Sequence, residues 1–438
     1  MTLQPHYFMV WMQKNGKGKI RGKDTDDKNR GECVIQRIHT WVTKKISIGL
    51  LWTLMLLGVL SGCDKQENSL FPQENRTGIT EDEIRIGSSL ALGGHAGYLG
   101  SQMLHGALAY INHINETGGI HGRKINLIAR DDGYDPTRCL YNTQQLILEE
   151  QVFSLFCYVG TPTTVRIIPL VNEAKIPLVG MFTGANRLRE PVNRYLINIR
   201  ASYYQETKAA VDYFVKEMKF DKVAVFYQYD EYGFDGLRGT EIALKSFGLI
   251  PVAKGSYVRG TLDVEAGLEK IMASRAQAVV MIGTYDSCAR FIQLARDQNF
   301  SPLFHNVSFV GPEELARRLG PIGEGVLVTQ VVPPPNAGEN ERALPGVTEY
   351  SDLLKQYYPQ SRPSFVGLEG YINAKILAEG LKRAGREITR EKFIQAIESI
   401  NDFDLGISNP LYFGKNDYQG LDQVYITKIR QGQLVLIK

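Results

Sequence analysis

Apolar runs that have the character of β-strands alternate with helical stretches along most of this chain. The series begins with IRIGSSLAL (84–92) and an expected helix at 101–116, and it continues through KVAVFYQ (222–228) and AVVMIGT (278–284). Alternation with short connections is typical of a parallel sheet covered by helices. The strands are too many for one comfortable sheet, so the sequence predicts an α/β fold with two doubly wound domains.

The C-terminal part of the chain departs from this alternation. A Pro/Gly-rich break, PPPNAGENERALPG (333–346), is followed by helical stretches expected at 350–357, 368–384 and 389–399. A short β segment, VYITKIR (424–430) with QLVLIK (433–438), closes the chain.

The N-terminal region contains the run KKISIGLLWTLMLLGVLSGCD (44–64). Its apolar centre, Ile46 to Leu60, is shorter than the roughly 20 residues that span a bilayer. A basic start, a short apolar centre and small residues before a cleavage point are typical of a secretory signal. The end, Leu60-Ser61-Gly62-Cys63, resembles a bacterial lipobox, which implies cleavage before Cys63 and lipidation of that residue. The alternative is a chance cysteine after an ordinary signal or anchor helix.

Residues 1–43 are polar and lack apolar periodicity, so we expect them to be disordered. We interpret them as an extension that results from an early start assignment, with translation beginning at Val42. The expected organisation is a leader at 1–62, made of this 43-residue extension and a lipoprotein signal peptide, followed by a tether at 63–80.

The charge balance argues against nucleic-acid binding. The chain has 50 basic and 47 acidic side chains, of which ten and four precede Cys63, so the remainder carries 40 and 43. It has no basic run with interleaved aromatic residues.

Cys139 and Cys157 could pair in an oxidising compartment, but Cys157 within VFSLFCYVG is more simply a buried thiol, and Cys288 remains unpaired in either case.

The sequence contains no nucleophile elbow, H-E-x-x-H, Walker loop or strand-linked G-x-G-x-x-G motif. Its seven histidines show no metal-ligand spacing. We therefore expect a binding protein with no enzymatic activity, no cofactor and no metal.

In open α/β sheets, ligands bind beyond the carboxyl ends of the strands. One such loop is Gly160-Thr161-Pro162-Thr163-Thr164, and a second is Phe182-Thr183-Gly184-Ala185, each expected to open a helix. Hydroxyls and free N–H groups at a helix start can bind a carboxylate. The alternative for each loop is ordinary helix capping by threonine.

The second domain places Tyr232, Tyr285 and Glu313 after its strands. The alternatives are rim packing for the tyrosines and a solvated helix-start carboxylate for Glu313. Together they offer aromatic walls and a partner for an ammonium group. The two domains would thus bind a zwitterion, its carboxylate on the first and its ammonium on the second.

From about Glu83 to the C-terminus the chain resembles type I periplasmic binding proteins of the Leu/Ile/Val-binding class. The resemblance is carried by NETGGIHGRKINLIARDDGYDP, GTPTT, IPLVGMFTGA, YDEYGFDG and GPEELA. It implies two Rossmann-like lobes joined by three crossovers, near Arg200, Thr329 to Pro333 and Asn401, and hinge closure around a ligand. The implied lobes are 81–199 with 333–400, and 200–332 with 401–438.

The resemblance also implies roles for individual residues. Tyr98 matches an aromatic lid, Thr161 a carboxylate-binding hydroxyl, and Glu313 the ammonium-binding glutamate. Phe182, Thr183 and Gly184 match the second carboxylate loop, and Tyr232 and Tyr285 match two tyrosines of the far lobe. The chain departs from the family where Phe182 replaces a small residue, where Gly184 replaces a threonine, and where Tyr134 replaces a disulfide cysteine. Phe182 could shrink the cleft, or it could turn outward.

We therefore expect a lipid-anchored receptor of an ABC importer that binds an amino acid or similar small carboxylate. It would be extracytoplasmic and monomeric, attached to the membrane only by its lipid, and its partners would be the permease and ATPase subunits. The alternative is a ligand-sensing receptor subunit for a membrane signalling protein. A lipoprotein enzyme is a weaker third reading.

Overall fold

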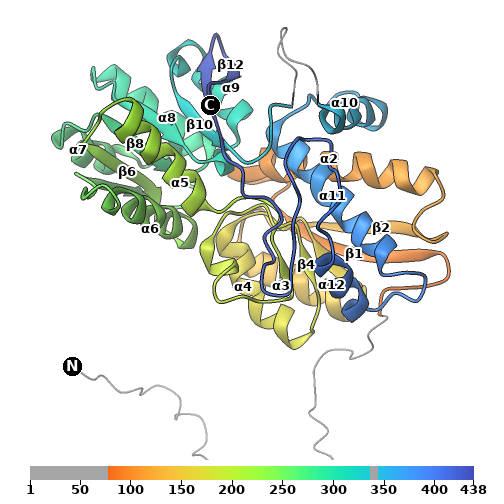
Figure 1. The fold of residues 1–438 in the computed structure, drawn as a ribbon. Coiled ribbons are helices and arrows are strands. Elements are labelled where there is room, and N and C mark those ends of the chain that lie inside the picture. Colours follow the sequence, from red (N-terminus) through yellow and green to blue (C-terminus); the bar gives the residue numbers. More distant parts are fainter. Residues whose placement is uncertain (1–76, 336–343) are drawn as a thin grey trace, which may run out of the picture. The chain divides into compact units, whose positions relative to one another are not determined.

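The computed structural model describes residues 77–335 and 344–438, which contain two β-sheets with helices packed against them (Figure 1). This confirms the predicted α/β fold class. The predicted leader, Cys63 and most of the tether lie outside the described residues. Within the described part of the chain, no helix is long and apolar enough to cross a membrane.

The first sheet is parallel, with the strand order β2-β1-β3-β4-β5. β1 is buried at every position from Ile86 to Leu90, whereas the edge strand β2 is mostly accessible. Burial is expected of an inner strand in a parallel sheet that helices cover on both faces. The strands are β1 (Glu83–Leu90), β2 (Lys124–Asp131), β3 (Ser154–Phe156), β4 (Leu178–Val179) and β5 (Leu196–Ile197).

Helices from both ends of the sequence pack with this sheet. α2 and α11 lie side by side (Figure 1). They approach so closely that a Cβ at Gly106 would lie 1.8 Å from the Gly367 carbonyl oxygen. The helices are α2 (Gly97–Glu116), α3 (Pro136–Leu148), α4 (Thr161–Glu173), α10 (Pro345–Tyr357), α11 (Phe365–Arg383) and α12 (Arg390–Glu398), with the 3-10 turns η1 (Gly94–Ala96) and η2 (Asn186–Leu188). We call this sheet and its helices the first lobe.

The second sheet has the order β12-β11-β10-β9-β8-β6-β7, and β11 is antiparallel to both its neighbours. Its strands are β6 (Val223–Gln228), β7 (Lys254–Tyr257), β8 (Ala278–Ile282), β9 (Leu303–Asn306), β10 (Leu327–Gln330), β11 (Tyr425–Arg430) and β12 (Gln433–Leu436). Its helices are α5 (Tyr203–Asp212) with the π-helical turn η3 (Tyr213–Glu217), α6 (Glu231–Lys245), α7 (Glu265–Ala273), α8 (Tyr285–Asp297), α9 (Pro312–Leu319), and the turns η4 (Ser308–Val310) and η5 (Gly320–Gly323). We call this sheet and its helices the second lobe.

The chain passes between the two sheets three times. It leaves the first sheet after β5 through 198–202, leaves the second after β10, and returns to the second between α12 and β11. Ser202 begins α5 with a capping box, in which its hydroxyl accepts from the Gln205 N–H and the Gln205 side chain accepts from the Ser202 N–H. The first crossover therefore ends at a well-defined helix start.

Two expected elements are shorter than the sequence indicated. The run PLFHNVSFV (302–310) predicts a strand, but β9 ends at Asn306 because the Ser308 N–H donates to the Glu206 carboxylate instead of a strand neighbour. A helical stretch was expected after Gly184, but only the single turn η2 follows. The Phe182–Ala185 loop therefore lacks the long helix whose N-terminus could bind an anion.

The three cysteines in the described residues are free and buried. The Sγ of Cys157 lies 3.5 Å from the Asn373 amide nitrogen. The interpretation of Cys157 as a buried thiol is confirmed.

Candidate functional site

The predicted site residues follow the carboxyl ends of strands in both sheets. In the first lobe, Tyr98 follows β1, Thr161 follows β3 and Thr183 follows β4. In the second lobe, Tyr232 follows β6 and Tyr285 follows β8, with Glu313 beyond β9. Parallel strands direct these loops to one edge of each sheet, which is where open α/β folds bind ligands.

Glu313 connects the two lobes. It lies in the first turn of α9, and its carboxylate accepts hydrogen bonds from the Phe365 N–H (2.7 Å) and the Tyr98 hydroxyl (3.3 Å), both in the first lobe. Phe365 is the first residue of α11, whose N-terminal dipole favours a negative charge. Burial nevertheless raises the pKa of Glu313 to about 7, because desolvation disfavours the charged form.

Tyr98 and Tyr285 extend this contact. The Tyr98 N–H donates to the Tyr285 hydroxyl at 3.5 Å, and the two rings meet edge to face at 6.1 Å. The Arg318 guanidinium lies 5.0 Å from the centre of the Tyr285 ring. Burial, and next the Glu313 charge, raise the pKa of Tyr98, so its hydroxyl remains a hydrogen-bond donor.

Thr161 and Thr183 form a second contact, within the first lobe. Their hydroxyls lie 2.7 Å apart, and the Thr183 hydroxyl also accepts from the Ala185 N–H at 3.2 Å. Both side chains are buried. Because the two hydroxyls share one hydrogen bond, one hydroxyl hydrogen remains available to a carboxylate.

The hydroxyls of Thr163 and Thr164 are differently placed. Thr163 donates to the carbonyls of Val159 (2.6 Å) and Gly160 (2.9 Å), and Thr164 donates to Gly160 (2.6 Å). These bonds hold the first turn of α4. Either hydroxyl could donate to a ligand only by breaking them.

Two of the three departures from the family pattern can be followed in the packing around Phe182 and Gly184. Phe182 is fully buried, and its ring stacks on Phe309 of the second lobe with the centroids 5.1 Å apart, so it faces inward. The Gly184 carbonyl accepts from the Tyr203 N–H at 2.7 Å, and a Cβ at this glycine would lie 2.6 Å from the Tyr203 ring. A threonine would not fit there unless Tyr203 moved.

Tyr232 lies in an aromatic cluster between the lobes. Its hydroxyl donates to the Gly283 carbonyl at 3.3 Å, and its ring lies 4.8 Å from Phe309 and 5.2 Å from Tyr203. Tyr134, which replaces the family's cysteine, lies 5.9 Å from Phe309. We call Tyr134, Phe182, Tyr203, Tyr232 and Phe309 the aromatic cluster.

The predicted residues thus form two groups. One joins Tyr98, Tyr285 and Glu313. The other contains the Thr161–Thr183 pair. It also contains Phe182 and Tyr232, which both contact Phe309 in the aromatic cluster, and Gly184, which packs against Tyr203.

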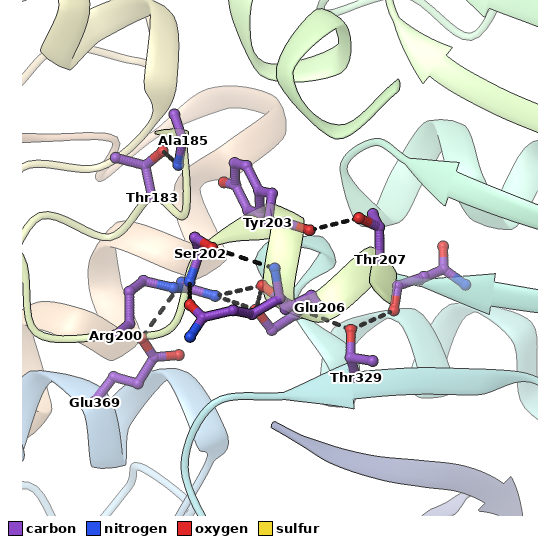
Figure 2. Close-up of polar contacts among 12 residues, drawn as sticks. Thr183, Ala185, Arg200, Ser202, Tyr203, Glu206, Thr207, Thr329 and Glu369 are labelled. Carbon is purple, nitrogen blue, oxygen red and sulfur yellow. Dashed lines mark hydrogen bonds and ion pairs between the residues drawn. The ribbon is translucent and has the colours of Figure 1, made fainter. Parts of the chain in front are cut away.

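Sequence reasoning missed a buried charged group between the lobes (Figure 2). Arg200 lies in the first crossover, and its guanidinium is 3.3 Å from both Glu206 and Glu369. It also lies 4.7 Å from the centre of the Phe182 ring. Glu206 and Glu369 come from α5 and α11, where a single carboxylate has no distinctive sequence signal. The sequence identifies Arg200 only as a crossover position.

Two α/β lobes joined by three chain crossings, with polar and aromatic side chains beyond the strand ends of both, define a two-lobed ligand-binding fold. The family model described as "Periplasmic binding protein" matches residues 83–433, so the chain belongs to this family. Within it, the chain is a type I protein of the Leu/Ile/Val-binding class, as the motifs predicted.

Three known proteins illustrate the similarity. A possible leucine/isoleucine/valine-binding protein from Rhodopirellula baltica has a crystal structure with 36% identity and a TM-score of 0.78, covering 84% of this chain and 98% of that one. Leu/Ile/Val-binding protein homolog 8 of Brucella abortus is 23% identical over 372 residues, which cover 81% of this chain and 90% of that protein. A fatty acid ABC transporter substrate-binding protein from Thermomonospora curvata shares the fold, with 22% identity and a TM-score of 0.76, and covers 84% of this chain and 94% of that one.

These similarities define a binding protein and not an enzyme, from a family that acts outside the cytoplasm. The two neighbours of known structure have different ligands in their descriptions.

Proposed function

We propose that this protein is the lipid-anchored receptor of an ABC importer and binds an amino acid, or a similar small carboxylate, in the cleft between its lobes. The observation that supports the proposal is that each lobe carries a group suited to one end of a zwitterion. Glu313 of the second lobe faces first-lobe donors, and the Thr161–Thr183 hydroxyl pair lies in the first lobe. The names of the relatives support an amino-acid ligand.

In this proposal, the ligand carboxylate accepts from the Thr161–Thr183 pair and from free N–H groups in the first turn of α4. Thr163 and Thr164 contribute through this turn of backbone, since their hydroxyls already bond carbonyls. The ligand ammonium pairs with Glu313, while Tyr98, Tyr285 and Tyr232 supply the walls. An ammonium group would keep Glu313 ionised despite its burial.

The test is a thermal-shift screen of the purified protein with amino acids and with amine-free carboxylic acids of similar size. A ligand at about 100 times its dissociation constant adds about 2.7 kcal/mol to the free energy of unfolding, which gives a measurable shift. We expect at least one amino acid to stabilise the protein and its deaminated analogue to do so much less. Stabilisation by amine-free acids alone would contradict the amino-acid assignment.

A further inference from the structure

The buried charged group around Arg200 draws its members from three parts of the chain. Arg200 belongs to the first crossover, Glu206 to the second lobe and Glu369 to the first lobe. Their side chains are 3%, 0% and 6% exposed, and the guanidinium lies 3.3 Å from each carboxylate. Figure 2 shows Arg200 and Glu369 pointing toward each other across the lobe boundary.

Glu206 is fully supplied with partners. Its carboxylate accepts from the Ser308 N–H (2.7 Å), the Ser308 hydroxyl (2.9 Å) and the Thr329 hydroxyl (2.7 Å), in addition to Arg200. Arg200 also donates to the Ser308 hydroxyl. Each of the two carboxylate oxygens of Glu206 therefore accepts from two donors. Arg200 and Glu206 therefore form a compensated pair.

Glu369 lacks comparable hydrogen-bond partners. Among the described residues, its carboxylate has no hydrogen-bond donor, and its one close partner is Arg200. That ion pair is not aligned as a hydrogen bond, and the Nε and Nη1 atoms of Arg200 are buried without a hydrogen-bond partner. Burial raises the pKa of Glu369 to about 7, although the Arg200 charge acts in the opposite direction, and the nearby charges of Glu206 and Glu313 add to the rise. An ionised carboxylate that is buried with so few partners lowers the stability of the fold unless a further cation pairs with it.

Other cations near the group are already engaged. Arg189 donates to the Gln419 side chain and to the carbonyls of Ala185 and Arg200. One guanidinium, Arg200, therefore faces two buried carboxylates, and Glu313 adds a third nearby.

Helix geometry places Glu369 next to the proposed ammonium site. Phe365, whose N–H bonds Glu313, lies four residues before Glu369 in α11 and therefore on the same helix face. The aromatic cluster adjoins the group, since Phe182 already has Arg200 at 4.7 Å. Aromatic faces also favour cations.

We infer that the ligand carries a second cationic group, which pairs with Glu369, so that its class is a basic amino acid such as lysine or ornithine. This inference rests on the proposed function and specifies its substrate class. A second ammonium would supply the missing counter-charge and hydrogen-bond donors. An aliphatic side chain would leave Glu369 buried and unpaired, or protonated.

The test is calorimetric titration of the purified full chain with L-lysine and L-norleucine, which differ by the terminal ammonium, and with the shorter pair L-ornithine and L-norvaline. Charge pairs of this kind change affinity by about 30-fold or more. For wild type, we expect the basic member of at least one pair to bind at least about 30-fold more tightly. This comparison needs no variant.

Glu369→Gln should remove most of that preference, with the neutral amino acid binding unchanged or more tightly. The matched control is Glu269→Gln, which removes the same charge from an exposed position on α7 and should keep the preference. Neutral amino acids that bind wild type as tightly as basic ones would overturn this inference alone. The inference would also be overturned if a folded Glu369→Gln variant bound the basic amino acid as tightly as wild type does. If no amino acid bound at all, the amino-acid assignment in the proposed function would fail as well.

Discussion

At the residue scale, Glu313 is the side chain that most directly joins the two lobes. Its carboxylate reaches from α9 to the first turn of α11 and to Tyr98, so it holds the lobes together through two hydrogen bonds. Burial raises its pKa to about 7. Its protonated form therefore stabilises the fold fully below the ordinary carboxyl pKa, and this contribution is lost as the pH rises through about 7.

Replacing Glu313 by glutamine tests its role and its titration together. An ammonium ligand should lose about 30-fold or more in affinity, because its counter-charge is removed. An amine-free acid should bind as well or better.

Wild-type affinity for the amine should rise with pH up to about 7, because the carboxyl must ionise to bind it. Glu369 titrates in the same pH range. The contribution of Glu313 is therefore measured as the difference between variants: in calorimetric titrations, the affinity for the amine should change less with pH in Glu313→Gln than in wild type. An identical slope would contradict a role for Glu313.

Thr161→Val keeps the shape of the side chain and removes its hydroxyl. If the Thr161–Thr183 pair binds a carboxylate, affinity should fall about tenfold or more, since hydrogen bonds to charged groups contribute roughly 1.5–3 kcal/mol. Thr164→Val is the matched control, because its hydroxyl is bonded to the Gly160 carbonyl, and it should weaken binding less. If titration gave equal affinities for wild type and Thr161→Val, the hydroxyl of Thr161 would not bind the ligand, and its role would be that of a helix cap.

At the scale of elements, the contact of α2 with α11 determines where the site residues lie. α2 carries Tyr98, and α11 provides the N–H that bonds Glu313 and the carboxylate of Glu369. The two helices are distant in sequence, and glycines on both allow them to approach closely, with Gly370 packed on the Met103 carbonyl.

Gly106→Ala should separate these helices. Its Cβ would lie 1.8 Å from the Gly367 carbonyl oxygen, so we expect the free energy of unfolding to fall by about 1–3 kcal/mol, the usual cost of overpacking. Gly97→Ala, at the start of α2, is the control, because its nearest neighbour lies 3.1 Å away. Chemical denaturation of both variants measures the difference. Equal stability of the two would show that the close approach is unimportant.

For the whole molecule, we predict attachment to the membrane through a lipid on Cys63. Residues 63–76 connect the described lobes to the predicted lipid site at Cys63. Acyl chains contribute about 0.8 kcal/mol per buried CH₂, so stable attachment should depend on them.

Cys63→Ser should therefore abolish incorporation of labelled palmitate and move the protein out of the detergent phase on extraction. Cys139→Ser, which alters a buried thiol in the first lobe, is the control and should keep the label. Label retained in Cys63→Ser would show that the lipobox interpretation is wrong.

The sequence by itself determined the features that depend on local pattern. Apolar periodicity predicted the strands and helices, and the motifs near Thr161, Thr183 and Glu313 predicted the family. Local pattern did not show that β9 ends at Asn306, since that depends on a bond from Ser308 to Glu206, more than 100 residues earlier.

Only the tertiary structure decided which of these residues meet. It turned Phe182 inward onto Phe309, engaged the hydroxyls of Thr163 and Thr164 with backbone carbonyls, and placed Arg200 against Glu369. The physical reason is that burial and charge pairing depend on distances between side chains far apart in the sequence. A glutamate on a helix has the same local pattern whether its neighbour in space is water or a buried arginine.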